Sequence, residues 1–193
     1  MELARYLANK LLVCAIFGFC YLAAYDFSVG FDLVHSFAPG ISLIFIPAGV
    51  KLVAAMVSGF WGVLGTVIAL TYAAPEFWAD QPLWFYPLYG SISGFTTLFA
   101  VNLMKRLLRI EDDLSNLSLL QLPVIDFFST LCHGFVVNVF FLLCNLSAGP
   151  DLLLRATGMA VGDFVGGMIL LVGLALVLKL SEVWRSKRAD FLS

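Results

Sequence analysis

Charged side chains are scarce in this sequence of 193 residues. Asp, Glu, Lys and Arg make up 12% of the chain, whereas a soluble domain carries about 25%, so a water-facing surface cannot be built from this supply. Eleven basic and thirteen acidic residues give a net charge of −2, which excludes the basic surface that nucleic-acid binding needs. Because 61% of the residues are hydrophobic, the composition predicts an all-α polytopic membrane protein.

Motifs for metals and nucleotides are also missing. The four cysteines lie in apolar runs without a C-x-x-C pair, so we expect buried free thiols and not a metal site. The sequence contains no Walker, Rossmann or H-E-x-x-H pattern. We therefore expect no cofactor, no metal and no nucleic-acid partner.

Long apolar stretches are plentiful. A helix rises 1.5 Å per residue, so crossing about 30 Å of hydrocarbon takes about 20 residues. We expect a single integral-membrane domain over residues 1–193, a bundle of about six transmembrane helices with a tight turn near Ser58-Gly59. The expected spans are residues 9–25, 41–57, 59–75, 83–104, 122–145 and 156–180.

Basic residues predict the orientation, because Lys and Arg collect on the cytoplasmic side of a membrane. With both termini cytoplasmic, nine of the eleven basic residues lie at that side: Arg5, Lys10, Lys105, Arg106, Arg109, Lys179, Arg185, Lys187 and Arg188. We expect a multi-pass protein of the bacterial inner membrane, in contact with membrane lipid. Aromatic residues at 77–89 are expected to form a belt at the outer interface.

Several polar residues fall inside the apolar stretches, where an ionisable group costs at least about 2.5–3.5 kcal/mol. Counting from the outer ends of the spans places Lys51, Asp163 and Asn138 at similar depths in the outer half of the bundle. Two interpretations stay open. Lys51 and Asp163 form a structural ion pair, or they line a cavity that binds a small ligand.

Proline and glycine interrupt the second span just before Lys51. Proline fits the first turn of a helix and breaks its interior. A helix beginning near Pro47, inside the membrane, would direct free N–H groups and a positive dipole end into the protein, and with Lys51 it would form an anion site. The alternative is an ordinary kinked span. The candidate ligand-binding residues are Lys51, Asp163, Pro47, Gly49 and Asn138.

Catalysis is not expected. Asp126, Ser129 and His133 lie at i, i+3 and i+7, hence on one helix face, as a proton relay or an intramembrane hydrolase would require. A hydrolase also needs an oxyanion site, and no glycine-rich nucleophile turn accompanies these residues. The sequence therefore predicts a protein that is not an enzyme.

Two segments are candidates for contact with a protein partner. Gly158, Gly162 and Gly166 repeat at every fourth position of the last span, and this spacing lets two helix backbones approach closely, within the chain or in a homo-oligomer. The connection 105–121 carries a basic and then an acidic group of residues and is expected in the cytoplasm.

Two short motifs resemble known families. Phe45-Ile46-Pro47-Ala48-Gly49, within residues 45–65, and Val161-Gly162-Asp163-Phe164-Val165-Gly166 resemble segments of the bacterial membrane-associated sensor domain family. That family forms the sensory module in front of histidine kinases and diguanylate cyclases. Its members usually have about eight spans and an output domain, so the resemblance implies a shortened, stand-alone relative that acts through separate subunits.

The substrate-binding subunits of energy-coupling-factor vitamin transporters are a second resemblance, through six spans and a G-D pair in the last. The first span lacks their alanine-rich coupling motif. The sequence thus leads to a non-enzymatic sensory or accessory subunit with a polar cavity. An uptake subunit for a small anionic or vitamin-like solute, and a scaffold subunit of a larger complex, are the alternatives.

Overall fold

The computed structural model describes residues 2–31, 41–147 and 151–192. Its five helices are α1 (Glu2–Gly30), α2 (Ile46–Phe77), α3 (Phe85–Leu107), α4 (Gln121–Leu143) and α5 (Leu152–Leu192). Among the described residues, four of these helices are long and apolar enough to cross a membrane, namely α1, α2, α4 and α5. The all-α class is confirmed, and the helices indicate a multi-pass membrane protein.

The prediction of six separate spans is not confirmed, and α2 and α3 are the reason. The expected spans 41–57 and 59–75 fall within the single element α2, apart from residues 41–45, which are not helical. The expected span 83–104 corresponds to α3, which is not among the four helices apolar enough to cross. Its glycine, serine and threonine residues and its basic end lower its hydropathy.

Helix α2 reverses direction at Gly59, where the predicted turn is confirmed. Gly59 has φ 56° and ψ −132°, a conformation open mainly to glycine. In a continuous helix residues 54 and 62 would be about 12 Å apart, yet a Cβ atom added to Gly62 would lie 2.9 Å from the carbonyl oxygen of Ala54. The first arm, residues 46–58, is about 20 Å long and cannot cross a membrane as a helix alone.

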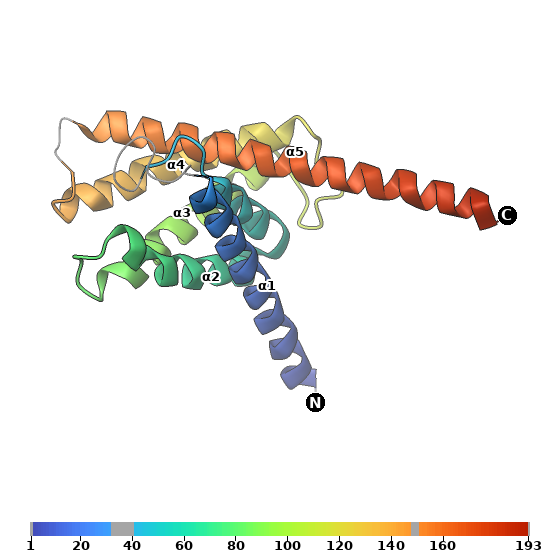
Figure 1. Ribbon diagram of the computed structural model, residues 1–193, viewed down its shortest axis with the longest axis horizontal. Coiled ribbons are helices and arrows are strands. Elements are labelled where there is room, and N and C mark those ends of the chain that lie inside the picture. The colour runs from blue at the N-terminus through green and yellow to red at the C-terminus, as the bar shows by residue number, and fades with distance from the viewer. Residues whose placement is uncertain (1, 32–40, 148–150, 193) are drawn as a thin grey trace.

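The helices form one bundle with two projecting ends. Helix α1 packs on α2, α2 also contacts α3 and α5, and α4 packs against α3 and α5. The N-terminal part of α1 and the C-terminal part of α5 extend away from the bundle (Figure 1). The side of a membrane on which each terminus lies stays a prediction.

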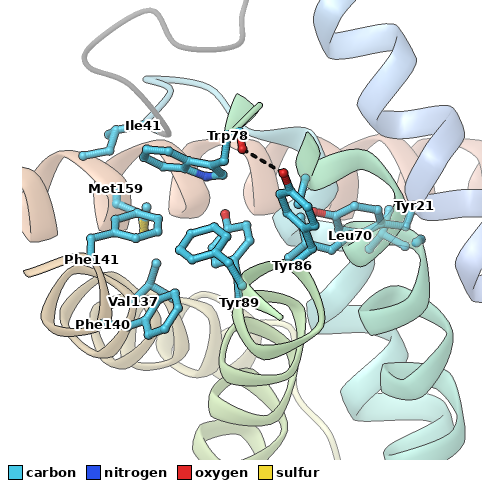
Figure 2. Packing of buried hydrophobic residues seen from close by; sticks show 14 residues of the cluster. Tyr21, Ile41, Leu70, Trp78, Tyr86, Tyr89, Val137, Phe140, Phe141 and Met159 are labelled. Carbon is cyan, nitrogen blue, oxygen red and sulfur yellow. Dashed lines mark hydrogen bonds between the residues drawn. The ribbon is translucent and has the colours of Figure 1, made fainter. Parts of the chain in front are cut away.

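Aromatic residues fill one end of the bundle, the aromatic cluster of Figure 2. Trp78 and Phe141 lie 4.9 Å apart between ring centroids, and Phe85 and Phe140 lie 5.2 Å apart. The Tyr86 hydroxyl donates to the Trp78 carbonyl oxygen at 3.1 Å. The expected belt is therefore largely wrong: these rings pack on one another inside the protein, while Trp84 is 57% exposed.

The opposite end of the bundle is aliphatic. Residues from the first arm of α2, among them Leu52 and Met56, pack with Val101, Met104 and Ile125. The Gly59 turn therefore lies towards the connection between α3 and α4, and the two apolar clusters leave a polar layer between them.

Candidate functional site

Four polar side chains from four helices meet in that layer and form what we call the polar cluster. Nζ of Lys51 (α2) lies 3.1 Å from Oγ of Ser93 (α3) and 3.1 Å from Nε2 of His133 (α4). Ser93 Oγ and His133 Nε2 are 2.8 Å apart. His133 Nδ1 lies 2.5 Å from Oδ2 of Asp163 (α5). The cluster thus links four helices through side chains.

The short arm of α2 explains how Lys51 reaches this layer. Pro47 occupies the first turn of α2, where its missing N–H costs no hydrogen bond. The preceding residue Phe45 donates its N–H to the carbonyl oxygen of Gly162 at 3.0 Å. A Cβ atom on Gly162 or Gly166 would collide with the backbone of residues 42–46. Glycine therefore lets this segment lie directly on α5, next to Asp163.

Every member of the cluster is buried. The exposed fractions are 2% for Lys51, 1% for Ser93, 4% for His133 and 3% for Asp163. A buried charge is tolerated only with a partner. Lys51 and Asp163 make no direct ion pair with each other; His133 lies between them, so the predicted pair is replaced by a relay of three groups.

A small cavity adjoins the cluster. It encloses about 20 Å³, room for about one water molecule. Tyr21, Tyr89 and Met159 line it together with members of the cluster. The Tyr21 hydroxyl is buried and has no hydrogen-bond partner, so it is a donor without an acceptor beside this cavity.

Only part of the predicted site lies here. Lys51 and Asp163 line the cavity. Asn138 does not: it donates to the carbonyl oxygen of Gly134 at 2.8 Å and lies 3.6 Å from the Met159 sulfur. Gly49 is a packing position, since a Cβ atom there would lie 2.8 Å from the Leu170 side chain.

Pro47 likewise starts the helix and does not line the cavity. The alternative, a span from residue 41 with a kink at Pro47, is wrong: the helix begins at Ile46, so Pro47 lies in its first turn and not in its interior. The half-helix interpretation agrees with this start.

The sequence did not identify Ser93 as a member of the cluster, and it grouped His133 with Ser129 instead. Ser93 lies between Gly90 and Gly94, and a Cβ atom at either glycine would meet Val67 of α2. Two glycines four residues apart that flank a serine are a signal of close packing, and they could have identified this face of α3. Ser129, the serine considered with His133, is buried in α4 one turn before His133, but the serine that pairs with His133 Nε2 is Ser93.

Asp126 is a further buried carboxylate, on α4 and facing α5. Its side chain is 1% exposed, and it lies so close to α5 that a Cβ atom on Gly167 would be 2.5 Å from Oδ2. Oδ2 has no hydrogen-bond partner. Among the described residues, no group of three or more His, Cys, Asp and Glu side chains is placed to hold a metal ion.

The cluster has the connectivity of a proton-transfer relay. Ser93 and Asp163 contact opposite nitrogens of one imidazole, which fixes the ring between a hydroxyl and a carboxylate. The contact between His133 Nδ1 and Asp163 Oδ2 falls outside hydrogen-bond geometry, and it is an ion pair only when the imidazole is protonated. Such contacts often align only when a ligand is bound.

Comparisons with known proteins give no relative: no family model, no curated protein and no solved structure matches the chain. The resemblance to the sensor domain family, which rests on two short motifs, and the resemblance to the transporter subunits, which rests on six expected spans and a G-D pair, therefore stay predictions.

Proposed function

We propose that the chain is a sensory or accessory module of a bacterial inner membrane that acts through separate partner proteins. The observation that carries this proposal is the polar cluster, in which α2, α3, α4 and α5 each contribute one buried polar side chain. The resemblance to the membrane-associated sensor domain family adds support, because Asp163 belongs to its closing motif.

A ligand in the cavity would act by redistributing these contacts. Lys51 and Tyr21 present donors there, and a bound acceptor would compete with Ser93 and His133 for the Lys51 ammonium group. A ligand shifts a helix arrangement only by its difference in affinity between two states. Because the cluster joins four helices, a change in one contact would alter the packing of all four.

The partner surface that we favour is the segment 105–121. Its backbone is held by local bonds, such as Asn116 Nδ2 to the Arg109 carbonyl oxygen at 2.9 Å. The Ser115 N–H donates to Asp113 and lowers the pKa of that carboxyl, so Asp113 stays charged at neutral pH. Leu119 and Leu120, near the end of the segment, are 80% and 84% exposed.

The glycine ridge is a poorer candidate for a partner or a homo-oligomer. Gly162 and Gly166 already pack on residues 42–46 of the same chain, and Gly158 is buried.

A scaffold subunit is the second candidate function. The cluster's own hydrogen bonds and the water-sized cavity favour it, because a structural cluster needs no ligand. No observation favours uptake of a vitamin-sized solute, since about 20 Å³ holds about one water molecule.

Native mass spectrometry of the gently purified protein tests these candidates. The sensory proposal expects a non-covalent small-molecule adduct or a bound partner protein whose binding changes in Lys51→Ala. A partner that binds wild type and Lys51→Ala equally, with no small-molecule adduct on either, would leave the scaffold as the function. Phe99→Leu, at a residue 67% exposed, is the control and should behave as wild type.

A further inference from the structure

The polar cluster contains the connectivity of an acyl-transfer site. Ser93 Oγ lies 2.8 Å from Nε2 of His133, and Asp163 Oδ2 lies 2.5 Å from Nδ1 of the same ring. This order of nucleophile, base and orienting carboxylate is recognised by geometry and not by sequence position or fold. We propose that Ser93 is an activated nucleophile that accepts an acyl group from a lipid ester, with His133 as general base and Asp163 as the positioning residue.

Lys51 supplies a positive charge beside the nucleophile. An ammonium group can only donate hydrogen bonds, so Lys51 donates to Ser93 Oγ and to His133 Nε2, both at 3.1 Å. The Ser93 hydroxyl in turn donates to the same Nε2 atom at the shorter distance of 2.8 Å, so its proton has His133 as its acceptor. The same ammonium lies next to the place where the carbonyl oxygen of a bound ester becomes negative. Donors fixed at that place are a main source of catalysis in acyl transfer.

Tyr21 offers a second donor. Its hydroxyl is fully buried, has no partner and borders the cavity that Lys51, Ser93, His133 and Asp163 also line. The cavity has room for about one water-sized group, so of a bound ester it would take the carbonyl oxygen alone, with Tyr21 and Lys51 as the donors that line it. Tyr21 of α1 and Lys51 of α2 are therefore the candidate oxyanion donors of this proposal, in a sequence without a glycine-rich nucleophile turn.

The reaction balances with these groups and water. Ser93 Oγ forms a bond to the acyl carbon while its proton moves to His133 Nε2. The bond from the acyl carbon to the alcohol oxygen then breaks, and the alcohol leaves with that proton. Water repeats the sequence on the acyl-serine, which releases a carboxylic acid and restores the Ser93 hydroxyl.

The substrate class follows from the surroundings of the cluster. An apolar groove between α1 and α2, of about 620 Å³, is lined by residues such as Leu11, Leu22, Ala69 and Tyr72. Leu22 and Ala69 are sequence neighbours of Tyr21 and Leu70, which line the small cavity. The same two helices, α1 and α2, therefore line both the groove and the cavity. An ester whose acyl chain lies in the groove would reach Ser93 only if these helices separate at Tyr21 and Leu70, which are buried.

A fluorophosphonate probe tests the proposal on the full-length protein in detergent. An activated serine displaces fluoride and keeps the phosphonate as a stable adduct. We expect one adduct per chain in the intact mass, located on Ser93 by peptide sequencing, so the result does not depend on any variant. A folded protein without an adduct, or with its adduct on another residue, would overturn the proposal.

Variants separate the nucleophile from its surroundings. Ser93→Ala should abolish labelling, whereas Ser129→Ala, a buried serine one turn from His133, should label as fast as wild type. Asp163→Asn keeps the size of the side chain and should slow labelling about 100-fold or more, because the imidazole loses its orienting charge. Equal labelling rates in Asp163→Asn and wild type would show that Asp163 is only structural. The covalent adduct survives denaturation, so this result is independent of the non-covalent ligand that the sensory proposal expects.

Discussion

Two regions of the bundle hold the same helices together by different forces. The aromatic cluster packs Trp78, Phe85 and Phe141 with ring centroids 4.9–6.0 Å apart, and such contacts tolerate small shifts. The polar cluster uses directional contacts between single atoms. When one partner is lost there, the others stay buried without compensation. The aromatic end therefore stabilises many similar arrangements, whereas the polar layer selects one of them.

The largest expected effect is the loss of one charge from the polar cluster. Lys51→Ala or Asp163→Ala should each lower the free energy of unfolding by about 3 kcal/mol, because each leaves an uncompensated charge in the bundle. The double variant should lose much less than the sum. Unfolding in mixed detergent micelles measures all three variants in one thermodynamic cycle.

Additive losses of unfolding free energy in this cycle would contradict the difference drawn between the polar cluster and the aromatic cluster. They would mean that Lys51 and Asp163 do not interact through His133, and that the polar layer behaves like independent packing sites. Tyr72→Phe is the control, because Tyr72 is 76% exposed and lies outside the cluster, and it should leave the free energy of unfolding unchanged.

A change of size in the aromatic cluster should have a smaller effect. Phe141 is fully buried and contacts Trp78 and Tyr89. Phe141→Leu should cost about 1.5 kcal/mol, because the neighbouring rings close part of the space. The same substitution at Phe99, which is 67% exposed, should leave the unfolding transition unchanged. A loss at Phe141 as large as that of Asp163→Ala would show that the aromatic end is as selective as the polar layer.

The smallest expected change in unfolding free energy is at Tyr25, which makes both a ring contact and a hydrogen bond. Tyr25 packs edge-on against Phe77 at 5.1 Å and donates a hydrogen bond to Glu76 at 2.7 Å. Tyr25→Phe keeps the ring contact and removes the bond, so it should cost about 1 kcal/mol. Glu76→Gln, which keeps an acceptor, should cost less. If Tyr25→Phe unfolds like wild type, the ring contact alone holds α1 to α2 at this end.

Much of the fold could be predicted from periodicity and composition alone. The helices, the turn at Gly59 and the common depth of Lys51 and Asp163 follow from apolar length, glycine and counting along a helix. The short first arm of α2 could not be predicted, because its start depends on a backbone contact between Phe45 and Gly162 on a distant helix.

The composition of the site was harder to predict for a related reason. Helical spacing relates residues on one helix, and it led to Ser129 as the neighbour of His133. The serine that contacts His133 comes from α3, and which helices face each other is decided by tertiary packing. Asn138 was predicted to line the cavity because of its depth along α4. Its side chain points to another side of that helix and contacts Met159.

The segment before the short arm of α2 also has a consequence for the order of assembly during synthesis. Lys51 is made long before its partner His133, which lies 82 residues further along the chain, and Gly162, the acceptor for Phe45, follows later still. Until α4 and α5 have entered the membrane, the start of α2 has an unpaired backbone and an uncompensated charge. The first arm of α2 therefore completes its contacts late although it is made early, because the centre of the bundle can close only after Gly162 and Asp163, in the first third of α5, have been synthesised.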